Sequence, residues 1–442
     1  MKIAILGAGV SGLALARFLV EGGVGAHQLS LFEAASVAGG LCRSKTVQGF
    51  TYDVAGGHIL YSKDAHALGW MIEHSGGEDA YVKQPRNTRI RFEHRWVNYP
   101  FENGLGDLPP QANFECLKGY VEAWHARRVA QSSAPTEFGA WVKWRFGEGI
   151  ARHFMDPYNA KVWKRDLDFL TSDWVAGRVP DAPVDDVLRA SVGIRTEGYT
   201  HQSSFHYPKR GGFQAITDGL AATLERRIRL NTPVAELVKT KNGWRVNAEE
   251  FDVVVSTLSL TDLPRVVKGM PDAVARACTG LEYNGLVCIL LALRRPAHPE
   301  LSWIYLPHEI QGPANRVTYM SNYARELAPP EHASLSCEIT VPGGAPMPGA
   351  EVEQQTIDGL VRAGLLRRDE VLFTDRSEVR QAYVVFDHAY HDRRRVALGW
   401  LEDEDLIPLG RFGRFEYDNS DQCVIKAREL AKKLLPRLAR GA

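Results

Sequence analysis

The sequence lacks the cysteine patterns that mark disulfide-rich or zinc-binding proteins. Its six cysteines lie far apart, with no Cys-x-x-Cys pair and no histidine at ligand spacing, so we expect neither a disulfide framework nor a metal site. It also lacks any run near the ~20 apolar residues that a membrane-spanning helix requires. Glycines and Arg17 interrupt the apolar N-terminus, where a signal peptide would otherwise be considered. These absences predict a protein of the reducing cytoplasm, without a membrane span.

The sequence has no excess of charge of either sign. The 442 residues carry 53 Lys and Arg against 53 Asp and Glu, so no global attraction to nucleic acid or to an anionic membrane is expected. With 45% hydrophobic and 24% charged residues, the composition is typical of a folded chain. The length fits two or three domains of roughly 150 residues each.

The N-terminus has the pattern of a dinucleotide-binding unit. Residues 2–6 form a short apolar run typical of a buried parallel strand, and a glycine-rich turn and an apolar helix follow. In this turn Gly7 allows the tight bend, Gly9 lets the backbone approach a pyrophosphate, and Gly12 lets the helix pack closely. A second strand ends at Glu33, at about the ~20-residue distance at which a carboxylate binds the ribose. The helix N-terminus would then bind the phosphates.

The next segment favours FAD over NAD as the dinucleotide. Gly39 and Gly40, followed by Leu41 and Arg43, come shortly after the ribose carboxylate. They resemble the second fingerprint of the FAD-binding amine-oxidase-like superfamily, in which the glycines contact the flavin dinucleotide. In that superfamily later strands complete the cofactor domain, and the residue at Val234 offers its backbone to the adenine. The strands predicted here cover residues 232–237, 244–246 and 251–257.

The resemblance implies an α/β fold with a Rossmann-like FAD-binding domain that is discontinuous in sequence. A helical substrate-binding domain and a second, antiparallel-sheet domain accompany it. The expected boundaries are residues 1–78, 205–265 and 396–442 for the FAD-binding domain, 104–204 for the helical domain, and 79–103 with 266–395 for the antiparallel sheet.

Segments spread over nearly the whole chain are similar to the UDP-galactopyranose mutase family. They are residues 55–62, 97–103, 157–163, 177–179, 207–212, 303–307, 316–323 and 410–421. Members of this family bind reduced FAD and interconvert the pyranose and furanose forms of a UDP-sugar. The resemblance therefore implies FAD, active in its reduced form, and a nucleotide-sugar substrate.

The resemblance also implies nucleophilic catalysis by the cofactor. In the family's reaction N5 of the reduced flavin attacks the anomeric carbon and displaces UDP, and the resulting flavin–sugar adduct opens and recloses through another hydroxyl. No net redox change occurs, so the enzyme would be an isomerase (an intramolecular transferase) for a sugar of the UDP-galactose type. By resemblance, Arg178 and Arg316 stabilise the charge developing on the diphosphate, and His58 lies beside the flavin. These three are the predicted catalytic residues.

Further binding residues follow from the same resemblance. Gly57, Gly410, Arg411, Asn419, Ser420 and Asp421 are expected at the flavin, where the last three would begin a helix whose N-terminus favours an anionic reduced ring. The residues expected at the diphosphate or the sugar are Tyr99, Tyr305, Tyr390, Tyr417 and Asn419, and those expected at the uridine are Tyr158, Asn159 and Trp163.

Two positions depart from the family pattern. Glu102 stands where the family carries a neutral amide that binds the uracil. A carboxylate accepts hydrogen bonds but cannot donate them, so a guanine, with its N1–H and N2–H donors, would suit Glu102 better than a uracil. Alternatively, Glu102 points to solvent. Asn419 replaces what is often an acidic residue.

Three further interpretations stay open. The first is a mutase that acts on a GDP- or dTDP-sugar. The second is a flavin oxidase or desaturase of the amine-oxidase superfamily. The third is a non-catalytic protein on the same fold, as in Rab GDP-dissociation inhibitors. The reductant, NAD(P)H or another, has no motif of its own in the sequence.

Overall fold

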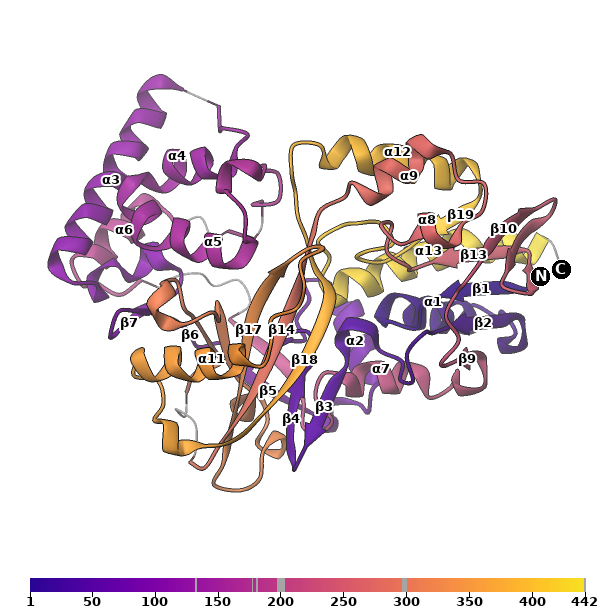
Figure 1. The fold of residues 1–442 in the computed structure, drawn as a ribbon, viewed down its shortest axis with the longest axis horizontal. Helices are drawn as coiled ribbons and strands as arrows, with labels where there is room; N and C mark the ends of the chain where they lie inside the picture. The colour runs from indigo at the N-terminus through magenta and orange to yellow at the C-terminus, as the bar shows by residue number, and fades with distance from the viewer. Residues whose placement is uncertain (132, 177, 180–181, 197–202, 296–299, 441–442) are drawn as a thin grey trace.

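A computed structural model describes residues 1–442 except 132, 177, 180–181, 197–202, 296–299 and 441–442. Gly177, which belongs to one of the family-like segments, lies outside the described residues. Figure 1 shows three parts: a helical part, a central long-stranded sheet, and a part that contains both the first strand and the last helix. No helix in the described part of the chain combines the length and the apolar character needed to cross a bilayer.

A five-stranded parallel sheet forms the centre of the cofactor-binding part, counted over the described residues. Its strand order is β19-β13-β1-β2-β9, and its strands come from three separate stretches of the chain. Their bounds are β1 (Ile3–Leu6), β2 (Leu29–Phe32), β9 (Ile228–Arg229), β13 (Val253–Ser256) and β19 (Leu406–Pro408). Every residue of β1 and of β13 is buried, as expected for strands covered on both faces of a parallel sheet.

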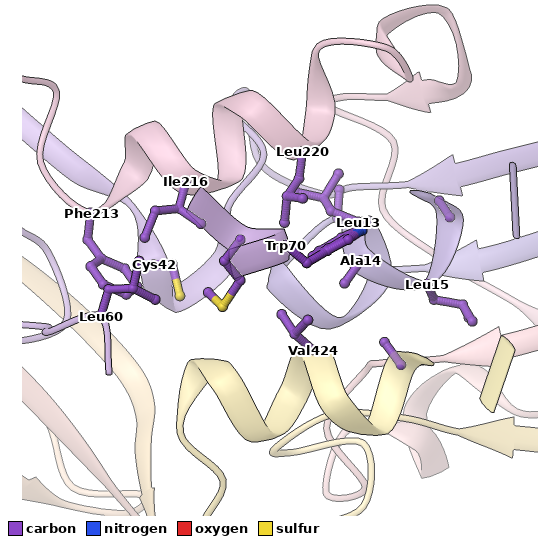
Figure 2. Close-up of a cluster of buried hydrophobic side chains, with 14 of the residues drawn as sticks. Leu13, Ala14, Leu15, Cys42, Leu60, Trp70, Phe213, Ile216, Leu220 and Val424 are labelled. Carbon is purple, nitrogen blue, oxygen red and sulfur yellow. The ribbon is translucent and has the colours of Figure 1, made fainter. Parts of the chain in front are cut away.

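Helices from distant parts of the sequence pack around the first helix of this part. Figure 2 shows Leu13, Ala14 and Leu15 of that helix between the side chains of Ile216 and Leu220 on one side and that of Val424 on the other. The helices concerned are α1 (Val10–Glu21), α2 (Ala65–Glu73), α7 (Gln214–Ala221) and α13 (Ser420–Arg440). Burial of these apolar side chains joins the discontinuous segments into one unit.

The central sheet has the strand order β18-β14-β17-β16-β15-β6-β7 in the described residues. Its strands are β6 (Thr88–Phe92), β7 (Arg95–Asn98), β14 (Tyr283–Leu293), β15 (Trp303–Tyr305), β16 (Arg316–Tyr319), β17 (Ala333–Pro342) and β18 (Val371–Val384). Alternate residues of β14 pack on opposite faces, one against the cofactor-binding part and the other against the core beneath α11 (Glu351–Arg362).

One pair in this sheet departs from the predicted antiparallel arrangement. β15 pairs with β6 in parallel, whereas the other neighbours in the sheet are antiparallel. β6 and β15 lie far apart in sequence, so no tight hairpin forces them to run in opposite directions.

The helical part consists of α3 (Pro110–Ala130), α4 (Phe138–Ile150), α5 (Asp156–Trp163) and α6 (Val184–Ser191). A single π-helical stretch, Ala151–Met155, joins α4 to α5. α3 and α4 approach closely at Gly149, because this residue has no Cβ. A Cβ there would lie 2.2 Å from the carbonyl oxygen of Glu115. Lys161 on α5 donates to the carbonyl oxygen of Leu306 at 2.8 Å, which connects this helix to the segment after β15.

The remaining elements extend these three parts. They are β3 (Ser44–Val47), β4 (Phe50–Asp53), β5 (Tyr81–Pro85), β8 (Ser204–Pro208), β10 (Leu237–Thr240), β11 (Gly243–Val246), β12 (Glu249–Phe251), α8 (Leu263–Val266), α9 (Asp272–Thr279), α10 (Met320–Tyr323) and α12 (Tyr390–Asp403). The strand predicted over 232–237 is wrong for all but its last residue. The side-chain oxygen of Asn247 accepts hydrogen bonds from the backbone N–H groups of Ala235 and Glu236, so these groups do not join a ladder.

Candidate active site

A cavity of about 1030 Å³ lies where the three parts of the fold meet. It is as large as the upper end of ordinary ligand pockets, which span roughly 300–1,000 Å³. It is therefore large enough to hold a large ligand such as a dinucleotide. Most of the predicted site residues line it: Gly7, Gly9, Glu33, Gly39, Gly40, Leu41, Gly57, His58, Tyr99, Glu102, Tyr158, Asn159, Trp163, Arg178, Tyr305, Arg316, Gly410, Arg411, Tyr417, Asn419, Ser420 and Asp421.

The glycine-rich turn forms one wall of the cavity. Gly7 has a φ of +105°, and a Cβ on Gly12 would lie 2.1 Å from the carbonyl oxygen of Gly7. A Cβ on Gly40 would lie 3.1 Å from the Cα of Gly9. Only glycine fits these positions, and the backbone at the start of α1 is left open to a ligand phosphate.

The carboxylate of Glu33 is held in place at the same wall. One oxygen accepts a hydrogen bond from the backbone N–H of Ala8 at 3.0 Å, and the other accepts one from that of Ala35 at 2.9 Å. A ribose needs an acceptor carboxylate at this place in the fold. The glycine turn and the fixed carboxylate thus fit an FAD, which would place its pyrophosphate at the start of α1 and its ribose at Glu33.

Three predicted cofactor residues do not line the cavity. Gly12 acts through the close packing of α1, and Arg43 donates from Nε to the carbonyl oxygen of Gly40 at 3.0 Å. Arg43 therefore supports the Gly39–Gly40 turn. Val234 lies in the segment before β10, outside the cavity lining given by the described residues.

His58 lies in a loop that a buried aspartate holds. Asp53, at the end of β4, is fully buried and accepts from the backbone N–H of His58 at 3.1 Å and from the hydroxyls of Ser44 and Tyr207 at 2.7 and 2.8 Å. Burial alone would raise the pKa of Asp53, but its hydrogen bonds with His58 and Ser44 outweigh burial and lower it. The His58 ring stacks on Phe213 with centroids 5.0 Å apart. Asp53 is therefore ionised, and its hydrogen bonds hold this wall of the cavity in place.

Arg316 is paired with a buried glutamate that the sequence analysis missed. Arg316 on β16 lies opposite Glu338 on β17, and its Nε donates to Glu338 Oε1 at 2.6 Å while an Nη donates to the carbonyl oxygen of Gly57 at 3.0 Å. Glu338 is 1% exposed. Burial alone would lower the pKa of Arg316, but the Glu338 carboxylate raises it well above its ordinary value. Arg316 therefore stays charged.

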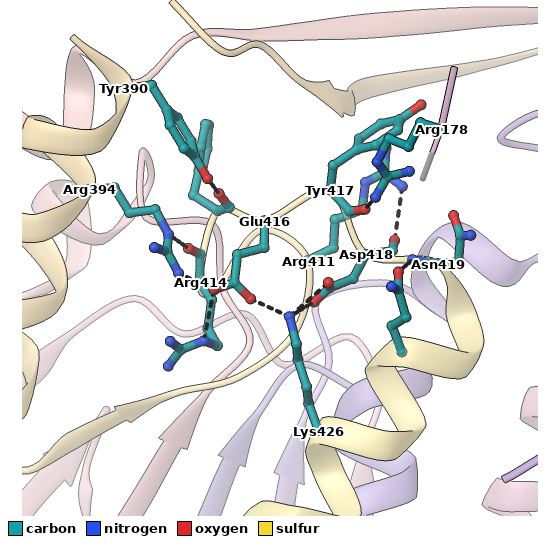
Figure 3. A network of polar contacts seen from close by, with 12 residues as sticks. Arg178, Tyr390, Arg394, Arg411, Arg414, Glu416, Tyr417, Asp418, Asn419 and Lys426 are labelled. Atoms are coloured by element: carbon teal, nitrogen blue, oxygen red, sulfur yellow. Dashed lines mark hydrogen bonds and ion pairs between the residues drawn. The ribbon is translucent and has the colours of Figure 1, made fainter. Parts of the chain in front are cut away.

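Arg178 and Arg411 both lie over the ring of Tyr417, at 4.0 and 4.3 Å from its centroid. Arg178 also donates to the backbone oxygen of Tyr417, and Arg411 donates to the backbone oxygens of Asp418 and Ala382. Figure 3 shows both guanidinium groups beside the Tyr417 ring. Burial lowers the pKa of Arg178 below the ordinary arginine value, which still leaves it charged near neutral pH.

Tyr383 links the two arginine sites. Its hydroxyl donates to Glu338 Oε2 at 3.3 Å, and its ring lies 6.1 Å from that of Tyr417. Burial raises the pKa of Tyr383 well above its ordinary value, so its hydroxyl stays protonated and can donate. The sequence analysis missed Tyr383 and named Tyr390 instead. Tyr390 is buried, and its hydroxyl donates to the backbone oxygen of Phe415 at 2.5 Å. Figure 3 shows it on the far side of this segment from Arg178.

A cluster of tyrosines extends the cavity toward the helical part. The ring of Tyr305 lies 5.3 Å from that of Tyr99 and 5.1 Å from that of Tyr158. Burial raises the pKa of Tyr99 and of Tyr158, so both keep their protons. These hydroxyls are neutral donors, suited to phosphate or sugar oxygens.

Asn159 and Trp163 line the cavity but bond chiefly to their own segment. Asn159 donates to the backbone oxygen of Met155 at 2.8 Å and accepts from the Trp163 indole at 3.2 Å. The Asn159 amide is therefore satisfied without a ligand, and these contacts hold the start and end of α5 together.

Helix α13 begins at the cavity with Ser420, so its N-terminus faces a ligand there. Lys426, nearly two turns into the helix, forms ion pairs with Asp418 and Glu416 (Figure 3). These pairs fix the preceding segment, which carries Tyr417 and Asn419, relative to the helix.

Comparisons with known proteins agree with this architecture. The family model "Flavin containing amine oxidoreductase" matches residues 10–365. Mitochondrial protoporphyrinogen oxidase of Nicotiana tabacum is 23% identical over 308 residues, which cover 59% of this chain and 58% of the relative. Tryptophan 2-monooxygenase of Allorhizobium ampelinum is 27% identical over 309 residues, which cover 59% of this chain and 41% of the relative. The chain thus spans less than two thirds of the length of these curated relatives.

Solved structures match over almost the whole chain. A crystal structure of reduced UDP-galactopyranose mutase has a TM-score of 0.90 at 26% identity, covering 98% of this chain and 95% of the other. A putative protoporphyrinogen oxidase from Exiguobacterium sp. 255-15 has a TM-score of 0.74 at 17% identity, covering 99% of both chains, and shows the fold alone. The first match confirms the resemblance and the fold class predicted from the sequence.

Proposed function

This chain belongs to the family of flavin-containing amine oxidoreductases, and we propose that it is a nucleotide-sugar mutase that interconverts the pyranose and furanose forms of a nucleoside-diphosphate sugar. The observation that carries the proposal is the placement of Arg178 and Arg316 in the cavity that also contains the glycine turn and Glu33. A cofactor cradle and two cations in one cavity fit a diphosphate substrate next to a flavin.

The proposed reaction needs cations at the leaving group. When UDP or a related diphosphate leaves the anomeric carbon, negative charge grows on its oxygens, and fixed guanidinium groups stabilise that charge more than the ground state. The bound reduced flavin supplies the nucleophile. Arg316, held by Glu338, and Arg178, held over Tyr417, would contact the diphosphate. The neutral hydroxyls of Tyr99 and Tyr158 would donate to phosphate or sugar oxygens.

A flavin oxidase is the second candidate. The curated relatives carry the names of an oxidase and a monooxygenase, and an oxidase would use the same cofactor cradle. It would oxidise an organic substrate and reduce oxygen to peroxide, with no diphosphate to neutralise. Such a reaction does not require two arginines around a diphosphate.

Turnover assays with holoenzyme separate the two candidates. Dithionite-reduced protein is incubated with UDP-, GDP- and dTDP-sugars, and the furanose and pyranose forms are resolved by anion-exchange chromatography. We expect conversion of at least one nucleotide sugar. The variant Arg395→Ala, which removes an arginine whose side chain is 75% exposed, serves as the matched control and should convert at the wild-type rate. No conversion of any nucleotide sugar at full flavin occupancy would defeat the proposal, and substrate-dependent peroxide release would support the oxidase.

A further inference from the structure

Glu102 is a buried carboxylate without a full set of partners. It lies in the 3₁₀ turn Phe101–Asp107, is 5% exposed, and lines the cavity. Its Oε1 is buried and accepts no hydrogen bond within the described residues. A buried carboxylate oxygen without a donor is costly, so a ligand that brings N–H groups would satisfy it. The solvent-facing alternative raised by the sequence is thereby excluded.

The surroundings of Glu102 leave its carboxyl group partly ionised and partly protonated near neutral pH. Burial raises its pKa to about 7, while its own backbone N–H and the positive charge of Arg145 on α4 act in the opposite direction. Tyr120 on α3 and Tyr99 before the turn are the other titratable groups that interact with it. Burial raises the pKa of both tyrosines, so neither carries charge near pH 7.

A stack of flat rings lies beside this carboxylate. Phe101 and Phe154 stack with centroids 4.8 Å apart and planes 8° apart, and Phe154 and Tyr158 stack at 5.3 Å and 7°. All three rings line the cavity with Glu102. Tyr158 also lies close enough to Arg316 for the guanidinium to act on the pKa of its hydroxyl, although burial outweighs that effect and raises the pKa. The rings stack on one another, so they form an apolar wall beside the unpartnered acceptor of Glu102, and an apolar wall with one acceptor suits a nucleobase that carries N–H donors.

We propose that Glu102 selects a guanine base, so that the substrate class is a GDP-sugar; this rests on the proposed function. Guanine presents N1–H and N2–H side by side, which match the two oxygens of one carboxylate. Uracil presents a single N–H between two carbonyl oxygens, which would face the lone pairs of Glu102. A glutamine in this position would satisfy the uracil pattern, because its amide both donates and accepts.

Nucleotide binding to oxidised holoenzyme tests this without turnover. Isothermal titration with GDP and UDP at pH 8, where Glu102 is mostly ionised, should give GDP the higher affinity by about tenfold, the discrimination expected of one bidentate pair. At pH 6 the carboxyl is mostly protonated, so the GDP affinity should fall and the UDP affinity should rise. Glu102→Gln should remove the GDP preference and its pH dependence. Glu148→Gln, an exposed carboxylate on the neighbouring helix α4, should change neither.

The outcomes distinguish this inference from the proposed function. UDP binding more tightly than GDP at pH 8, or an unchanged GDP affinity in Glu102→Gln with normal flavin absorbance, would overturn the assignment of guanine. If neither nucleotide binds, the base assignment fails, and the mutase fails with it when no UDP-, GDP- or dTDP-sugar is converted by reduced enzyme. GDP preference without conversion of any GDP-sugar by reduced enzyme would defeat the mutase and leave the base assignment standing.

Discussion

Replacing Arg316 with alanine should affect turnover and folding by two separable routes. The side chain donates to Glu338 Oε1 at 2.6 Å and to the carbonyl oxygen of Gly57 at 3.0 Å, and it lines the cavity. If Arg316 stabilises charge on a leaving diphosphate, its loss should cost about 2.7–4 kcal/mol of transition-state stabilisation, or about 10²–10³-fold in kcat. The assay is turnover of the dithionite-reduced enzyme on whichever nucleotide sugar is active.

The same substitution leaves Glu338 as a buried charge without its cation. Breaking a buried ion pair by removing one partner costs about 3–5 kcal/mol. We expect the lower end of this range, because Glu338 keeps the backbone N–H of Gly57 at 3.1 Å and the Tyr383 hydroxyl at 3.3 Å. The melting temperature of Arg316→Ala should therefore fall below that of the wild type.

A double variant separates the two effects. In Arg316→Ala combined with Glu338→Gln, a neutral amide replaces the buried charge, so the melting temperature should recover while kcat stays low. Arg395→Ala, at an exposed position, controls for loss of one positive charge. A loss of kcat under threefold in the folded single variant would refute the role of Arg316, and so would recovery of kcat together with stability in the double variant.

Three further predictions concern the redox state of the flavin, the glycine turn and Tyr390. Turnover should require prior reduction of the flavin, so aerobic, oxidised enzyme should be nearly silent in the chromatographic assay; equal rates in both redox states would contradict the mutase. Gly12→Ala should purify without yellow colour or flavin absorbance, because its Cβ would lie 2.1 Å from the carbonyl oxygen of Gly7, and full flavin occupancy would show that the turn relaxes. Tyr390→Phe should lower stability by about 1 kcal/mol through loss of its hydrogen bond to Phe415 and leave kcat within twofold. A large loss of kcat in that variant would place Tyr390 at the substrate after all.

The cofactor-binding turn can be predicted from the sequence, because the residues that form it are close together in the chain. Gly7 and Gly9 lie in the turn after β1, Gly12 lies in the first turn of α1, and Glu33 directly follows β2, so their arrangement follows from local spacing. The fold class is expected from the resemblance of these and later segments to a known family, and a solved structure with a TM-score of 0.90 confirms it. By resemblance, Arg178 and Arg316 are also placed in the cavity that the structure shows.

The residues that sequence analysis missed depend on contacts between distant segments. Glu338 meets Arg316 only because β16 and β17 pair in the register that places them opposite one another. Tyr383 reaches Glu338 from β18, the strand on the other side of β14. Asp53 is a strand-end aspartate with no motif, and its role arises from the hydroxyl and amide groups that surround it after folding. β17 (Ala333–Pro342) alternates apolar and polar residues, and Glu338 falls at a polar position of that pattern, so the sequence gives no signal that it is buried.

The arginines of the cavity differ in whether a carboxylate is paired with them. The charge of Arg316 is balanced by Glu338, so that this pair contributes a directed donor and little net charge. Arg178 and Arg411 contact Tyr417 and backbone oxygens, and neither forms an ion pair with a carboxylate in the described part of the chain. A nucleoside diphosphate and an anionic reduced flavin both bring negative charge into a partly desolvated space, where an unmatched charge is expensive. Under the proposed function, Arg411, which contacts the backbone before α13, would balance the ring, and Arg178 would balance the diphosphate. Since the charge of Arg316 is already matched by Glu338, we expect loss of Arg178 to weaken binding of a free nucleoside diphosphate more than loss of Arg316 does.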